Sequence, residues 1–90
     1  MTRLADHVRT THSPDGGIVL DIRHGQMFSL NPVASKIVEL LAEKREPAFV
    51  AQRIAELFDV SPEVALRDVE EFLATLERHA LVETHYPGAL

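Results

Sequence analysis

The stretch GIVLDIRHGQMFSLNP, residues 17–32, contains two strand-like runs, a turn signal between them and the start of a helix. The first run alternates apolar residues at period two, as in a strand with one apolar face: Ile18, Leu20 and Ile22. His24-Gly25 indicates a turn, and QMFSL (26–30) follows as the second run. The pattern predicts an antiparallel hairpin that ends directly in front of a helix.

The length of the hairpin loop can be inferred from which side chains share a face, because a slip of one residue turns every side chain over. A two-residue loop would place Phe28 and Leu30 opposite the apolar face of the first strand. A three-residue loop, Arg23–Gly25 with Gly25 left-handed, collects five apolar residues on one face by pairing Ile22 with Gln26, Leu20 with Phe28 and Ile18 with Leu30. This second register is the predicted one, and in it the backbones of Met27 and Ser29 point away from the first strand.

The flanking sequence predicts one more strand and three helices. HVRTTH (7–12) is a weaker strand candidate, and the Pro, Asp and Gly residues of SPDGG (13–17) predict a turn. Helices are expected at 31–44, 47–59 and 61–79, because each begins with a cap residue or a proline and carries an apolar stripe. The residues expected to face inward are Ala34, Ile37, Val38, Leu41, Val50, Ile54, Leu57, Phe58, Ala65, Val69, Phe72, Leu73 and Leu76.

These elements predict an α+β fold in which a three-stranded antiparallel sheet precedes three helices. The length of 90 residues and the 46% apolar content suit one packed domain, expected over residues 1–83, with a flexible tail at 84–90. The sequence has no cysteine and neither a signal peptide nor a long apolar run, which predicts a soluble cytoplasmic protein without disulfides or membrane contact.

The charge distribution argues against nucleic acid as a partner. Residues 1–45 hold six Lys or Arg against five Asp or Glu, whereas residues 46–90 hold three against nine. A short sheet with three helices suggests a winged-helix DNA-binding protein, in which the third helix would enter the major groove. Here that helix, 61–79, carries five acidic residues against two arginines, so phosphate would repel it.

No catalytic or metal motif is evident. The sequence has five histidines, His7, His12, His24, His79 and His85, and none is at a metal-motif spacing within a helix, so all are expected on the surface. Asp15-Gly16-Gly17 precedes no helix and no Lys-Ser/Thr pair, which favours a turn over a phosphate loop. We therefore expect neither an enzyme nor a bound cofactor or metal.

The strand at 26–30 is the remaining candidate for function. If the strands are ordered in the sheet as in the chain, this strand lies at an edge, and an extended peptide could pair with its free backbone groups. Two alternatives stay open: an edge shielded by a loop or helix, and a structural domain that dimerises edge to edge.

Three segments resemble the PqqD-like family, the recognition elements for precursors of ribosomally made, modified peptides. They are DGGIVLDIRHGQMFSLNPVASKIVELL (15–41), LFDVSPE (57–63) and DVEEFLATLERHALVE (68–83), and the resemblance covers roughly residues 7–83. It implies a winged helix-turn-helix-like arrangement and binding of a precursor's leader peptide as an added strand. The implied peptide-binding residues are Gln26, Met27, Phe28, Ser29 and Leu30 of the strand and Val69, Phe72, Leu73 and Leu76 of the last helix.

Within that family, the short chain and its opening residues look most like the discrete leader-binding proteins of lasso-peptide maturation. The resemblance then implies a non-catalytic adaptor that delivers the precursor to a separate leader peptidase. The runner-up is a peptide chaperone for a radical SAM enzyme, as in pyrroloquinoline quinone synthesis.

Overall fold

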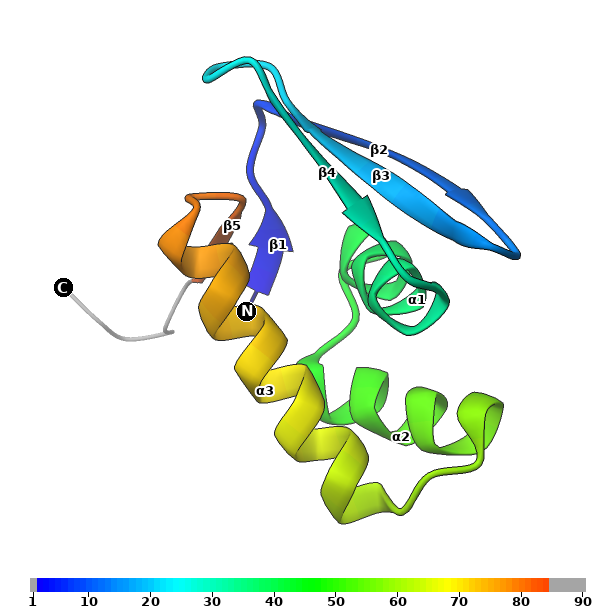
Figure 1. Ribbon diagram of the computed structural model, residues 1–90. Coiled ribbons are helices and arrows are strands. Elements are labelled where there is room, and N and C mark those ends of the chain that lie inside the picture. The colour runs from blue at the N-terminus through cyan, green and yellow to red at the C-terminus, as the bar shows by residue number, and fades with distance from the viewer. Residues whose placement is uncertain (1, 85–90) are drawn as a thin grey trace, which may run out of the picture.

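Five strands and three helices make up the fold in the computed structural model, which describes residues 2–84 (Figure 1). The chain order is β1 (Thr2–Leu4), β2 (Val8–Ser13), β3 (Gly16–Asp21), β4 (Gln26–Leu30), α1 (Pro32–Ala42), α2 (Pro47–Phe58), α3 (Pro62–Arg78) and β5 (Val82–Thr84). The strands β2, β3 and β4 form an antiparallel sheet in that order, and β1 pairs separately with β5. The predicted α+β architecture of a three-stranded sheet and three helices is confirmed.

The helices begin where the cap signals predicted. The Asn31 side chain accepts a hydrogen bond from the Ala34 amide at 2.8 Å, and Ser61 accepts one from Val64 at 3.2 Å. Each helix has a proline in its first turn, where no amide hydrogen bond is lost. The helix α2 ends at Asp59, which is left-handed with φ of 55°.

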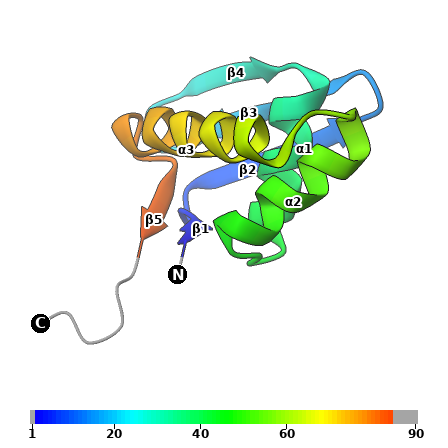
Figure 2. The ribbon, with the colours of Figure 1, turned by 90° about the horizontal axis from the view of Figure 1, so that it is seen from below.

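The core lies between the inner face of the sheet and the helices (Figures 1 and 2). The helix α1 packs on β2 and β3, while α2 packs on both α1 and α3. The predicted helical stripes supply most of the buried apolar residues, which include Ile37, Val38, Leu41, Val50, Ile54, Ala65, Val69, Leu73 and Leu76. One residue of these helical stripes is misplaced: Leu57, in the last turn of α2, is exposed.

The predicted register of the hairpin is wrong by one residue. The structure pairs Asp21 with Gln26, Val19 with Phe28 and Gly17 with Leu30, so the loop has four residues, Ile22–Gly25. Gly25 is left-handed as expected, with φ of 65°. The inner face of β3 therefore carries Val19, which is 1% exposed, whereas Ile18 and Leu20 on the outer face are 38% and 40% exposed.

The inner face of β3 is poor in large apolar residues because its neighbours leave little room. A Cβ atom on Gly17 would lie 2.5 Å from the Ser35 hydroxyl of α1 and 2.6 Å from the Thr11 carbonyl of β2. The Ser35 hydroxyl donates to the Gly16 carbonyl at 3.1 Å, which fastens the turn between β2 and β3 to α1. Period-two apolar residues thus mark the outer face of this strand, opposite to the predicted one.

Neither β1 nor β5 was predicted, because three-residue strands carry too little pattern to detect. Their pairing brings Thr2 opposite Thr84, and Arg3 forms an ion pair with Glu83 at 3.0 Å. Of the predicted tail, Thr84 belongs to β5 and residues 85–90 lie outside the described part of the chain. Within residues 2–84, no helix combines the length and the hydropathy needed to cross a membrane.

Candidate functional site: an open strand edge beside a groove

The outer edge of β4 has no neighbouring strand in the described sheet, because β4 is terminal in the order β2-β3-β4. The Ile22 amide donates to the His7 carbonyl at 2.9 Å, so the even-numbered residues of β3 bond toward β2 and the odd-numbered ones toward β4. The pairs of β3 with β4 then direct the backbones of Gln26, Phe28 and Leu30 inward. The backbones of Met27 and Ser29 consequently point outward.

These are the outward residues expected from the sequence, although the register was wrong. The error moved β3 by one position and left the inward residues of β4 unchanged. The Met27 side chain lies on the outer face of the sheet and is largely exposed, whereas Phe28 and Leu30 pack against the core. The predicted strand residues 26–30 thus provide an open backbone edge and two inward anchors.

A groove of about 160 Å³ lies between β4 and α3, which run alongside one another in Figure 2. The backbones of the two elements are not closely packed, and side chains make the contact between them. The rings of Phe28 and His79, for example, have centroids 5.2 Å apart. The lining is mainly apolar and consists of Val19, Phe28, Ser29, Leu30, Phe72, Thr75, Leu76, His79 and Leu81. Such a hollow beside a strand edge suits the side chains of an extended peptide.

The structure separates the four predicted residues of the last helix into two pairs. Phe72 and the buried Leu76 line the groove, whereas Val69 and Leu73 are buried in the core and do not reach it. Sequence reasoning missed Thr75 and His79, which also line it. Their positions three and seven residues after Phe72 place them on the same helical face, so the spacing alone could have indicated both.

The solvent face of α3 is acidic, with Glu63, Asp68, Glu70 and Glu71 all exposed. The groove itself holds no acidic or basic side chain apart from His79 among its lining residues. An anionic duplex would meet repulsion from this helix, while a peptide could seat apolar side chains beside it.

Comparison with known proteins identifies the family of this chain. A family model described as "Coenzyme PQQ synthesis protein D (PqqD)" matches residues 16–82. The chain belongs to the PqqD family. The matched residues include β3, β4 and all three helices, and so contain both walls of the groove.

Solved structures agree with the family assignment. TbiB1 in complex with the TbiA(beta) leader peptide has 28% identity and a TM-score of 0.85, over 93% of this chain and 98% of that one. Lasso peptide synthetase B1 complexed with the leader peptide has 28% identity and a TM-score of 0.81, over 92% and 98%. No curated protein sequence matches this PqqD-family chain.

A third structure shares the fold at lower identity. It is the solution NMR structure of the PqqD truncation of Methylobacterium extorquens PqqCD, described as a functional and stand-alone RiPP recognition element. It has 21% identity and a TM-score of 0.75, over 92% of this chain and 88% of that one.

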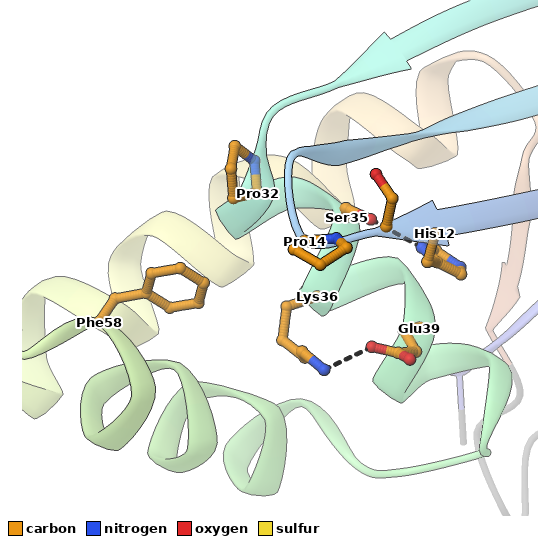
Figure 3. A pocket seen from close by; sticks show the side chains of 8 residues that line it. His12, Pro14, Pro32, Ser35, Lys36, Glu39 and Phe58 are labelled. Atoms are coloured by element: carbon orange, nitrogen blue, oxygen red, sulfur yellow. Dashed lines mark hydrogen bonds and ion pairs between the residues drawn. The ribbon is translucent and has the colours of Figure 1, made fainter.

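The structure has a second hollow, of about 350 Å³. It lies among α1, the end of α2 and the turn after β2 (Figure 3). Its polar groups are already paired with one another. His12 Nδ1 lies 2.7 Å from the Ser35 hydroxyl, and Lys36 contacts Glu39 at 2.6 Å. The hydrogen bond from Lys36 holds the pKa of Glu39 below its ordinary value. With its polar groups satisfied internally, this hollow is a weaker candidate than the groove beside β4.

The expectation that all histidines lie on the surface is wrong for His7, whose side chain is only 11% exposed. It lies beside Asp21, which is 1% exposed, at the closed end of the β3–β4 hairpin. His24 approaches the same carboxylate, with Nδ1 at 2.7 Å and its amide at 3.0 Å. Burial raises the pKa of Asp21, but the hydrogen bonds from His24 outweigh it and hold that pKa below its ordinary value.

The spacing of residues in the sequence could not reveal this cluster, because folding brings its three side chains together from different segments of the chain. His7 precedes β2, Asp21 ends β3, and His24 lies in the loop that follows. Of the others, His12 is half-buried against Ser35, His79 is exposed beside the groove, and His85 lies outside the described residues.

Proposed function

We propose that the protein is a non-catalytic adaptor that binds the leader region of a ribosomally made precursor peptide. The leader adds as a strand to the open edge of β4, and its apolar side chains enter the groove between β4 and α3. The observation that carries this proposal is the juxtaposition of the outward backbones of Met27 and Ser29 with the groove lined by Phe28, Phe72 and Leu76.

The relatives make a leader peptide the favoured guest. Two structures that share the fold at 28% identity, over nearly their whole length, are complexes with leader peptides, and one is a lasso peptide synthetase component. Membership of the PqqD family is consistent with the same class of ligand. The match to lasso peptide synthetase B1 favours delivery to a separate leader peptidase over service to a radical SAM enzyme.

The groove contains no catalytic arrangement among its lining residues. Its hydroxyl groups belong to Ser29 and Thr75, and its one titratable side chain is His79. The Thr75 hydroxyl donates to the Glu71 carbonyl at 3.2 Å and accepts from Arg78 at 3.1 Å, so it is engaged within α3 rather than aimed at His79. A nucleophile needs a base within hydrogen-bond reach, and this site offers a surface for binding instead.

The geometry also sets the expected affinity. The two outward residues of β4 can make about four main-chain hydrogen bonds, each worth about 0.5–1.5 kcal/mol net. Apolar leader side chains add about 25 cal/mol for each Å² that they bury, before the cost of association. A dissociation constant between about micromolar and tens of nanomolar is the expected result.

Proline substitution at the strand edge tests the binding mode. Ser29→Pro removes an outward amide from β4, and the matched control, Thr10→Pro, removes an outward amide from β2 at the opposite edge of the same sheet. Fluorescence anisotropy with the labelled leader of its own precursor should show weaker binding for Ser29→Pro alone. If both variants keep their circular dichroism spectra and bind like wild type, strand addition at β4 is wrong.

Delivery to an enzyme has its own test. The purified leader peptidase of the same pathway should cleave the precursor faster when this protein is present, and Ser29→Pro should abolish that gain. If the protein binds the leader tightly but does not change the cleavage rate, the proposed delivery to this peptidase is wrong. A mobility-shift assay with duplex DNA at low salt should show no complex, whereas salt-sensitive binding would favour the DNA-binding alternative.

A further inference from the structure

Three potential metal ligands converge at the closed end of the β3–β4 hairpin. One ligand atom from each of His7, Asp21 and His24 lies within 4.8 Å of the others. The two imidazole rings meet edge to face, with an interplanar angle of 83° and centroids 6.2 Å apart. They approach the same carboxylate from two different segments of the chain.

His7 supplies the observation that points to a missing partner. Its Nε2 atom is buried and makes no hydrogen bond to any described residue. Asp21 Oδ1 lies 3.8 Å from this atom, which is beyond hydrogen-bonding distance. Buried polar atoms nearly always have a hydrogen-bond partner. A buried nitrogen that faces a buried carboxylate without bonding to it therefore requires an explanation.

A small cation between the two side chains would explain the spacing. Zinc binds imidazole nitrogen and carboxylate oxygen at about 2.0–2.2 Å, so two tetrahedral ligands lie about 3.3–3.5 Å apart. His7 Nε2 and Asp21 Oδ1 are 3.8 Å apart, so they need to approach only slightly to reach this ligand–ligand distance. The separation of 2.7 Å between His24 and Asp21 must widen as the metal replaces the hydrogen that these atoms now share.

We propose that His7, Asp21 and His24 form a binding site for a divalent transition metal of the zinc class, with a fourth position open to solvent. The Nε2 atom of His7, the Asp21 carboxylate and one ring nitrogen of His24 are the ligands. The two nitrogen ligands favour zinc, copper or nickel over magnesium and calcium, which prefer oxygen.

The surroundings of the site are already organised for this role. The His24 amide donates to Asp21 Oδ1 at 3.0 Å and orients the carboxylate. The Ile22 amide donates to the His7 carbonyl at 2.9 Å and holds the His7 backbone against the hairpin. A hydrogen bond to a ligating carboxylate, such as the one to Asp21, is typical of metal sites. The His24 side chain is 53% exposed, which gives the ion a path from solvent.

The metal would join three segments that the chain brings together only on folding. His7 precedes β2, Asp21 ends β3, and His24 belongs to the loop that leads into β4. A bound ion would therefore fix the start of β4 relative to the rest of the sheet. Because only the folded protein presents all three ligands, the ion should also raise the melting temperature.

Zinc titration of the chelator-stripped, tag-free protein tests the site directly. Isothermal calorimetry with zinc chloride should give one saturable site of micromolar or tighter affinity, and magnesium chloride should give none. His24→Ala should weaken zinc binding at least about tenfold, because it removes one ligand while leaving the His24 amide in place. The matched control, His12→Asn, removes an imidazole that lies outside the cluster and should leave the affinity unchanged.

Cobalt(II) provides a readout that does not depend on any variant. Wild-type protein loaded with one equivalent should show visible absorption of a low-coordinate site, and added zinc should remove it. The proposal is overturned if zinc shows no saturable binding at a 1:1 ratio. It is equally overturned if His24→Ala binds zinc like wild type, since the ion would then lie elsewhere. Neither result depends on leader binding.

Discussion

Replacing Thr75 by phenylalanine should block the groove without disturbing the core. Thr75 is half-exposed and lines the hollow between β4 and α3. Its hydroxyl makes two exposed hydrogen bonds within α3, to Glu71 and from Arg78, and their loss should cost little. The aromatic ring would occupy the space that a leader side chain otherwise fills.

The size of the groove sets the expected loss of affinity. Its volume of about 160 Å³ resembles that of an apolar cavity of about 150 Å³, which holds one benzene molecule. The groove therefore accepts one side chain of leucine or phenylalanine size. Burying such a side chain is worth about 1.5–3 kcal/mol, which corresponds to a rise of about 10- to 150-fold in the dissociation constant.

Calorimetric titration with the leader peptide measures this loss, with Thr11→Phe as the control. Thr11 is exposed on the outer face of β2, away from the groove, so its replacement should leave the affinity unchanged. Both variants should melt near the wild-type temperature. If Thr75→Phe is folded and binds the leader within twofold of wild type, the groove does not hold a leader side chain.

Three further outcomes are expected, all measurable by urea or thermal unfolding. Ala80 is left-handed with φ of 57°, so Ala80→Gly should raise the free energy of unfolding by about 0.5–1 kcal/mol. Ala74→Gly, on the exposed face of α3, should lower it by a similar amount. If both variants change the free energy of unfolding in the same direction, the backbone at Ala80 is not strained. Gly17→Ala should cost about 1–3 kcal/mol, because its Cβ would lie 2.5 Å from the Ser35 hydroxyl, and a neutral result would mean that α1 can shift. The folded pKa of Asp21 is lowered, so its carboxylate stabilises the fold above the unfolded pKa of about 3.9 and this contribution is lost as pH falls through the folded value. With a chelator present, Asp21→Asn should therefore destabilise more at pH 7 than at pH 3; the same loss at both would contradict the assignment.

The helices could be predicted from the sequence because their signals are local. A proline marks each start, with a capping side chain before it at Asn31 and Ser61, and apolar residues repeat at helical spacing. The strand register could not be predicted by the same means. Its decisive contacts are nonlocal: Ser35 on α1 requires a glycine at position 17, and His7 approaches a buried Asp21. Counting apolar residues therefore selected the exposed face of β3 as the buried one.

The candidate site was predictable in part for a similar reason. The backbone direction of β4 depends only on alternation along that strand, so Met27 and Ser29 could be inferred without the correct partner residues. The groove wall depends on how α3 is rotated against β4. Apolar content alone could not distinguish Phe72 and Leu76, which line the groove, from Val69 and Leu73, which do not. It also gave no weight to Thr75 or His79.

The pairing of β1 with β5 places Thr2 directly across from Thr84, so the two ends of the described chain leave the domain side by side. Domains with adjacent ends tolerate insertion into other proteins, because the host chain can enter and leave at one point. The same unit can thus act as a separate subunit or as a module within a longer polypeptide without a change of fold. The PqqD portion of PqqCD, which shares this fold, is itself a part of a longer protein.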